Sequence, residues 1–157
     1  MTFPKIGNPA PLFTLQNQRA ETVALEQLRG SHNVVLYFYP AAMTPGCTVQ
    51  ACGMRDAAAE LAASDAIVLG VSRDPVAKLA RFAERDHLDF DLLSDPDHEV
   101  ASRYGAWGPK KFMGRSYDGI LRTTFLIDRE GRLRHVIAKV KTRNHHDEVL
   151  ALLRTLD

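Results

Sequence analysis

Residues 34–52 read VVLYFYPAAMTPGCTVQAC, and this stretch holds the only two cysteines of the 157-residue chain. Its first six residues are apolar and rich in β-branched and aromatic side chains, which is typical of a buried strand. A proline and glycine turn comes next, and the residues from Cys47 onward have a helical pattern. The sequence therefore places Cys47 where a strand ends and a helix begins, in the first turn of that helix.

The order of the predicted elements indicates an α/β fold. Strands and helices alternate from residue 34 onward, and the last two strands form a hairpin across residues 128–131. We expect strands at 13–15, 34–39, 66–72, 90–93, 121–127 and 133–138, helices at 23–28, 47–63, 75–86, 96–104 and 145–156, and a loop at 105–118. The pattern predicts a thioredoxin-like fold, with a central mixed β-sheet flanked by helices and an N-terminal extension, in a single domain over residues 1–157.

The bulk composition excludes several classes of partner. A net charge of +1, with 45% hydrophobic and 25% charged residues, is typical of a soluble globular protein and gives no electrostatic reason to expect nucleic acid or an anionic membrane as partner. No apolar run approaches the roughly 20 residues of a membrane span, and the N-terminus lacks the apolar stretch of a signal peptide. We therefore expect a cytoplasmic protein, in which a disulfide is transient rather than structural.

The position of Cys47 favours the ionised thiol, which is the nucleophilic form. A helix N-terminus offers unpaired backbone N–H groups and about half a positive charge. The Thr44 hydroxyl could donate to a thiolate if the loop folds back, and an arginine from another strand could add a full positive charge. Gly46 would let a small substrate approach the backbone closely.

The spacing of the two cysteines couples a disulfide to a change of shape. On one α-helix, five residues would separate the two Cα atoms by roughly 8–9 Å. A disulfide spans at most about 7 Å without backbone movement. Joining Cys47 to Cys52 therefore requires the first turns of the helix to unwind, whereas a Cys52 that is only a small buried side chain requires nothing of the kind.

The remaining candidate residues favour other interpretations. Two cysteines need further ligands to hold a metal, and none of the six histidines lies near them in sequence, so we expect no metal site and no cofactor. His145-His146 is interpreted as a solvated helix start, Lys110-Lys111 as part of an exposed loop, and Trp107 as a packing residue. A redox-sensing or metal-binding module on a thioredoxin-like fold is the alternative function, although the Cys-x-x-Cys motif of a disulfide exchanger is absent.

Residues 40–47, Pro-Ala-Ala-Met-Thr-Pro-Gly-Cys, resemble the active-site motif of the peroxiredoxins, Pro-x-x-x-Thr-x-x-Cys. The second cysteine, five positions further on, is similar to the arrangement in the bacterioferritin-comigratory-protein branch, also called peroxiredoxin Q. The similarity continues through residues 104–111 and 122–128 and so covers most of the chain.

This resemblance implies a thiol-dependent peroxidase that reduces hydrogen peroxide and organic hydroperoxides in antioxidant defence. Cys47 would attack the peroxide and become a sulfenic acid. Cys52 would resolve that acid as an intramolecular disulfide. Thr44 and Arg122 would hold the thiolate and polarise the O–O bond of the substrate.

The same resemblance implies the remaining site residues and the partners. Pro40 would shield the sulfenate from solvent, and the backbone N–H groups of Gly46 and Cys47 would contact the substrate. Thioredoxin or a glutaredoxin-like dithiol protein would restore the reduced enzyme. Because an intramolecular disulfide needs no second subunit, we expect a monomer.

Overall fold

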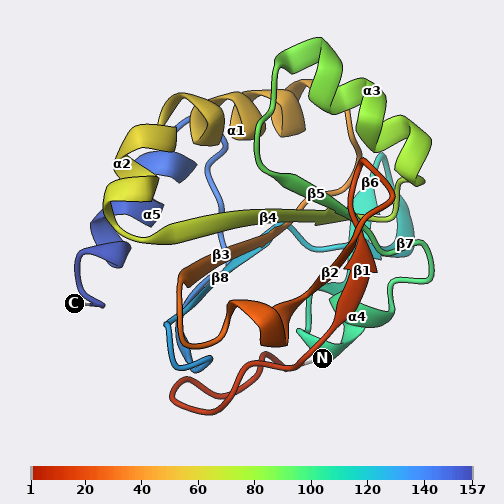
Figure 1. Cartoon of the computed structure of the whole chain (residues 1–157). Coiled ribbons are helices and arrows are strands. Elements are labelled where there is room, and N and C mark those ends of the chain that lie inside the picture. The colour runs from red at the N-terminus through yellow and green to blue at the C-terminus, as the bar shows by residue number, and fades with distance from the viewer. Residues whose placement is uncertain (1, 157) are drawn as a thin grey trace.

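The computed structural model describes residues 2–156, which form a seven-stranded mixed sheet with helices on both faces (Figure 1). The strands run in the order β2-β1-β5-β4-β3-β8-β9. They are β1 (Thr14–Gln16), β2 (Thr22–Ala24), β3 (Asn33–Phe38), β4 (Ala66–Ser72), β5 (Asp91–Ser94), β8 (Thr123–Ile127) and β9 (Leu133–Ile137). The helices are the 3₁₀ helix η1 (Leu25–Leu28) and the α-helices α1 (Pro45–Asp56), α2 (Ala58–Ala63), α3 (Val76–Asp86), α4 (Glu99–Arg103) and α5 (His145–Leu153). The predicted fold class is confirmed.

Strand β3 lies inside the sheet and separates two halves of the core. All six of its residues are buried, and it pairs in parallel with β4 and antiparallel with β8. Because successive side chains alternate between faces, Val35 and Tyr37 contact the core beneath α1, α2, α3 and α5. Val34 and Leu36 contact the opposite core, which α4 covers (Figure 1). A strand that is buried on both faces has a continuous apolar sequence, which explains why it is recognisable without a structure.

The segment predicted to be a loop at 105–118 contains a β-hairpin instead. Strands β6 (Trp107–Phe112) and β7 (Arg115–Ile120) pair antiparallel along their full length. Met113 and Gly114 form the turn with φ values of 51° and 79°, as the two central residues of a type I′ turn require. Most of the hairpin is exposed, so its sequence lacks the apolar alternation on which strand prediction depends.

Several predicted helices differ from the observed ones at their ends, including the one expected over 96–104, which is observed as α4 over Glu99–Arg103. The helix expected over 47–63 begins earlier, at Pro45, and is interrupted at Ala57, which divides it into α1 and α2. Proline suits this start because the first N–H groups of a helix have no intrahelical partner. The segment at 23–28 is a strand, β2, followed by η1. The last helix begins at His145 as predicted and ends at Leu153.

A buried carboxylate fixes the loop that joins β3 to α1. Asp74 Oδ2 accepts hydrogen bonds from the backbone N–H of Ala42 and from the hydroxyl of Ser72, each with a heavy-atom distance of 2.7 Å. Lys78 Nζ lies 3.2 Å from Asp74 Oδ1. Because Ala42 lies between the end of β3 and the start of α1, Asp74 helps to determine where α1 begins and hence where Cys47 lies.

Replacing Asp74 with alanine should lower the free energy of unfolding by about 2–3 kcal/mol, because the buried N–H of Ala42 then loses a charged acceptor. Urea denaturation followed by circular dichroism measures this change. Glu84→Ala, on the exposed side of α3, is the matched control and should change the free energy by less than about 0.5 kcal/mol. Equal stability of the two variants would contradict the assigned role of Asp74.

Candidate active site

Cys47 is the third residue of α1, and it is only 2% exposed. Thr44 is the N-cap of this helix, and its carbonyl accepts the first helical hydrogen bond, from the N–H of Thr48 at 2.9 Å. The thiol therefore belongs to the turn whose backbone N–H groups have no intrahelical partner. This is the position at the strand–helix junction that the sequence predicts.

Arg122 lies directly before β8, and the pairing of β8 with β3 brings it to the start of α1. Its Nη2 lies 3.4 Å from Cys47 Sγ, and its Nη1 donates to Gln50 Oε1 at 2.6 Å. A Cβ added to Gly46 would lie 3.4 Å from Arg122 Nη2, so the small residue leaves room beside the guanidinium. The structure thus brings three predicted site residues together and adds Gln50.

Thr44 makes a different contact from the one anticipated. Its hydroxyl donates to the carbonyl oxygen of Ala41 at 2.8 Å, rather than to the thiol. Thr44 is exposed at the surface of the loop, and Pro40 lies partly exposed two residues after the end of β3. Both residues therefore belong to the segment that surrounds Cys47, while the direct contact with its sulfur comes from Arg122.

Lys110 is a charged neighbour of the site that the sequence did not indicate. It lies on β6, partly buried, and its Nζ donates to the carbonyl oxygen of Ile120 at 2.8 Å. Burial lowers the pKa of Lys110, the positive charge of Arg122 lowers it further, and Cys47 acts in the opposite direction. The expectation of an exposed loop at Lys110-Lys111 is thus wrong for Lys110, because the hairpin turns alternate side chains toward the protein.

Cys52 lies on the same uninterrupted helix as Cys47 and is partly buried, and both thiols are free. The helical spacing keeps the two Cα atoms about 8–9 Å apart, too far for a disulfide in this conformation. Burial raises the pKa of the Cys52 thiol, and the nearby charge of Arg55 acts against that shift.

The C-terminal end of α3 holds this part of α1 in place. Arg55 Nη1 donates to the carbonyl oxygen of Asp86 at 2.6 Å, and Arg85 Nη2 donates to Thr48 Oγ1 at 2.9 Å. These bonds lie on either side of Cys52 along the helix. The turns that would have to unwind are therefore attached to α3.

His145 is not the solvated residue that the sequence suggested. It is 1% exposed, and both ring nitrogens lie within hydrogen-bonding distance of buried side chains, Gln50 and Thr124. The spacing of Gln50, three residues after Cys47 on one helix, could have indicated a residue beside the site. Nothing in the sequence near His145 could have indicated its partners, because they come from distant elements.

The histidines and cysteines are not gathered into a metal site. Within residues 2–156, no group of three or more His, Cys, Asp or Glu side chains is arranged to hold a metal ion. Trp107 packs as expected: its ring stacks on that of His98 at 3.8 Å, and the guanidinium of Arg73 lies 5.1 Å from the Trp107 ring centroid.

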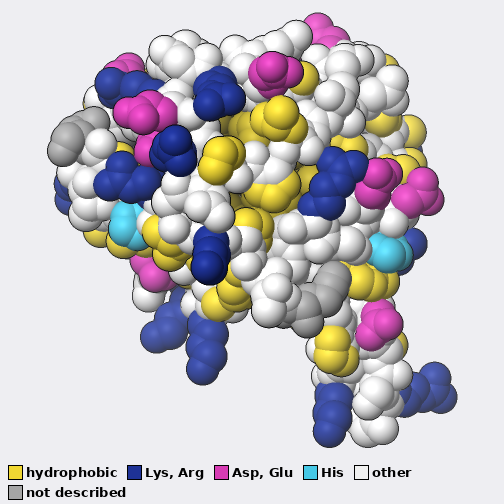
Figure 2. All heavy atoms as spheres, turned by 90° about the horizontal axis from the view of Figure 1, so that it is seen from below, with side chains coloured by type: hydrophobic (Ala, Val, Ile, Leu, Met, Phe, Trp, Pro, Cys, Tyr) yellow, Lys and Arg dark blue, Asp and Glu magenta, His cyan; other side chains and the backbone are white. Residues whose placement is uncertain are grey.

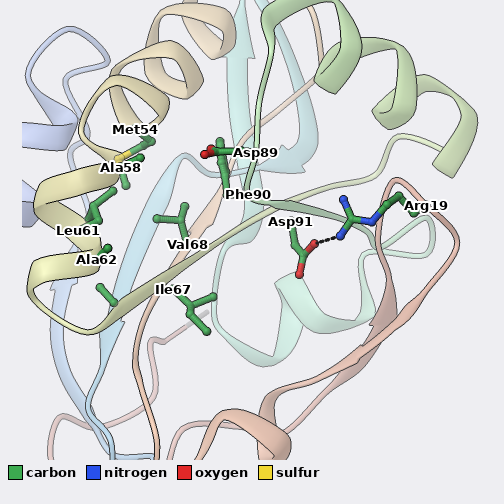
Figure 3. Close-up of a pocket in the computed structure, with 11 residues that line it drawn as sticks. Arg19, Met54, Ala58, Leu61, Ala62, Ile67, Val68, Asp89, Phe90 and Asp91 are labelled. Carbon is green, nitrogen blue, oxygen red and sulfur yellow. Dashed lines mark hydrogen bonds and ion pairs between the residues drawn. The ribbon is translucent and has the colours of Figure 1, made fainter.

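The molecular surface offers a pocket of about 370 Å³ that is separate from Cys47. Figure 3 shows Met54 and Leu61 on one side of it, Val68 and Phe90 nearby, and the ion pair of Arg19 with Asp91 at the other end. On the face seen in Figure 2, acidic and basic side chains are interspersed around exposed hydrophobic groups. None of the helices within residues 2–156 is long and apolar enough to cross a membrane.

Comparisons with known proteins agree with this architecture. Residues 6–136 match the AhpC/TSA family. Peroxiredoxin Bcp of Escherichia coli is 53% identical over 150 residues, which cover 96% of each chain. The crystal structure of peroxidoxin BcpB from Mycobacterium tuberculosis has a TM-score of 0.86 and 40% identity and covers 98% of each chain. A Xanthomonas campestris bacterioferritin comigratory protein, whose structures concern its alkyl peroxide reduction activity, has a TM-score of 0.86 and 33% identity over 91% of this chain and 90% of its own.

The fold and these relatives define a thiol peroxidase built on a thioredoxin-like sheet. The chain belongs to the AhpC/TSA family, and within that family it is a member of the Bcp, or peroxiredoxin Q, branch.

The raised pKa of Cys52 leads to a prediction about its reactivity. In a Cys47→Ser variant, the rate of Cys52 alkylation by iodoacetamide should reach half its maximum at a pH above that of a free cysteine peptide, because burial disfavours the thiolate. The pH dependence of alkylation, followed by intact mass, measures this. A midpoint at or below the value for the peptide would contradict the assigned environment of Cys52.

Proposed function

We propose that Cys47 is the peroxidatic cysteine of this enzyme. Its thiolate attacks the terminal oxygen of a hydroperoxide, the O–O bond breaks, and the products are a Cys47 sulfenic acid and an alcohol or water once the leaving oxygen gains a proton. The observation that carries this proposal is the guanidinium of Arg122, whose Nη2 lies 3.4 Å from Cys47 Sγ at the N-terminus of α1.

The groups around Cys47 suit the charge that develops in this reaction. Negative charge moves from sulfur to the leaving oxygen, so fixed donors beside the thiol stabilise the transition state. Arg122 supplies the charged donor, and the N–H groups of Gly46 and Cys47 supply backbone donors. The Thr44 hydroxyl, which donates to the carbonyl oxygen of Ala41, would join them by turning toward the sulfur. Pro40, in the loop between β3 and α1, would limit the access of water to the sulfenic acid.

Cys52 is proposed as the resolving cysteine. Its thiol attacks the sulfenic acid, a disulfide forms, and water leaves with the hydroxyl group of Cys47 and the proton of Cys52. Because the helix keeps the two residues apart, this step needs the turns between them to unwind. Unwinding would break the hydrogen bond from Arg55 to Asp86 and the one from Arg85 to Thr48. The chain holds no other cysteine that could take this role within one molecule.

The substrates proposed are hydrogen peroxide and organic hydroperoxides. The alkyl peroxide reduction activity named for the Xanthomonas campestris relative supports the second class. Thioredoxin or a glutaredoxin-like dithiol protein would reduce the disulfide again, in a cytoplasmic monomer that works in antioxidant defence. A redox sensor or metal-binding module has less support, because the relatives from Haemophilus influenzae and Escherichia coli are named as peroxiredoxins and because Cys47 is placed beside a charged donor.

One equivalent of hydrogen peroxide, added to the reduced protein, tests this cycle. Both thiols should disappear and the intact mass should fall by about 2 Da, as an intramolecular disulfide requires. Cys52→Ser should retain one rapid turnover, gain about 16 Da as the sulfenic acid, and lose thioredoxin-coupled recycling.

The outcomes separate the two parts of the proposal. Rapid peroxide consumption by Cys47→Ser would contradict the peroxidatic assignment. Undiminished thioredoxin-coupled cycling of Cys52→Ser would contradict the resolving assignment alone.

A further inference from the structure

His145 and Gln50 form a buried polar contact directly behind the cysteine. Gln50 is 0% exposed and His145 is 1% exposed, so water cannot replace a lost hydrogen bond of either side chain. Gln50 Nε2 lies 3.2 Å from His145 Nδ1, and His145 Nε2 lies 2.7 Å from Thr124 Oγ1. With the bond from Arg122 to Gln50 Oε1, these contacts form a continuous chain from β8 and α5 to the thiol.

The chemistry of the partners determines the direction of each bond in this chain. A guanidinium only donates, so the Gln50 atom that faces Arg122 has to be the amide oxygen. The amide NH₂ of Gln50 then faces His145, and Nδ1 of the ring has to accept. The ring proton must therefore be on Nε2, from which it is donated to Thr124 Oγ1.

We propose that His145 and Thr124 are positioning residues for the peroxidase reaction: they orient the Gln50 amide so that its oxygen holds Arg122 beside Cys47. This inference rests on the proposed function of Cys47. The opposite ring tautomer would place an N–H against the NH₂ of Gln50. Rotation of the amide to avoid that clash would turn its NH₂ toward the guanidinium, where two donors oppose each other.

The charges around His145 agree with a neutral ring. Burial is the largest cause that lowers the pKa of His145 to about 4, and the neighbouring His146 and Arg122 contribute to the same shift in that order. The aromatic ring of Tyr37, on β3, packs edge-on against the His145 ring with 5.6 Å between centroids. At neutral pH the ring therefore carries one N–H proton. The chain of hydrogen bonds determines whether this proton is on Nδ1 or on Nε2.

A histidine at this position could instead serve only to pack α5 against the sheet. In that case its loss would lower stability, while the reactivity of the folded fraction would not change. The two roles are distinguishable because a positioning residue acts through Gln50 and Arg122, so its effect on the reaction should disappear when Gln50 can no longer bind the guanidinium.

The first test measures the second-order rate constant for oxidation of Cys47 by hydrogen peroxide in reduced, folded protein. His145→Leu and Thr124→Val should each lower it, His145→Leu by roughly 10- to 100-fold, as the loss of a group that orients a reacting residue commonly does. In a Gln50→Leu background, the same His145→Leu change should lower it by less than about threefold. His135→Leu is the matched control, because this partly exposed histidine lies on β9 and bonds to Thr155, beyond the end of α5, rather than to Gln50 or Thr124; its rate should equal that of the unsubstituted chain.

The second test does not depend on activity, and its deciding measurement uses the unsubstituted chain. Nitrogen-15 NMR of histidine-labelled, reduced protein at pH 7 should show the proton of His145 on Nε2, and Thr124→Val should move population toward Nδ1 because the Nε2 proton loses its acceptor. A proton on Nδ1 in the unsubstituted chain, or an equal loss of rate from His145→Leu with and without Gln50, would overturn the proposal. Failure of the unsubstituted chain to react with peroxide would instead overturn the function of Cys47, and the tautomer measurement would still decide the orientation of Gln50.

Discussion

The contact between the Arg122 guanidinium and the Cys47 sulfur is the interaction on which the rest of the site depends. One arm of the guanidinium faces the thiol and the other binds Gln50, so the charge is held by two groups of the same helix. A charge fixed in this way needs no rearrangement when negative charge develops on a bound peroxide. The surrounding residues either hold the guanidinium and the thiol together or allow α1 to unwind.

The sheet provides that geometry through the pairing of β3 with β8. β3 delivers the chain to the start of α1, and β8 begins one residue after Arg122, so the register of the two strands decides how close the guanidinium comes to the thiol. Asp74 fixes the intervening loop through the N–H of Ala42. Unwinding of α1 breaks different contacts. Cys52 can reach Cys47 only if the α1 turns that are bound to α3 unwind. The buried residues Gln50 and Met54 lie within or next to those turns.

The sequence predicted the parts of this structure that follow from local patterns. A continuous apolar run revealed β3, and the proline and glycine turn located Cys47 at the start of a helix. The exposed hairpin of β6 and β7 has no such pattern, so the sequence predicts an exposed loop where Lys110 is in fact partly buried on β6. His145 was missed for another reason: its partners Gln50 and Thr124 lie 95 and 21 positions away, and only the packing of α5 against α1 and β8 brings them together. Arg122 could be selected only by resemblance to a family, since composition does not distinguish it from other arginines.

Hydrogen exchange at the backbone amides of residues 48–54 tests the central claim most directly. In the reduced protein these amides should be protected, because α1 is an intact helix whose geometry holds Arg122 and Cys47 together. After one equivalent of peroxide, in protein whose loss of about 2 Da shows the disulfide, the protection should be lost in the turns between the two cysteines. Protection that stays unchanged in the disulfide form would contradict the account, because two cysteines on an intact helix lie too far apart to be joined.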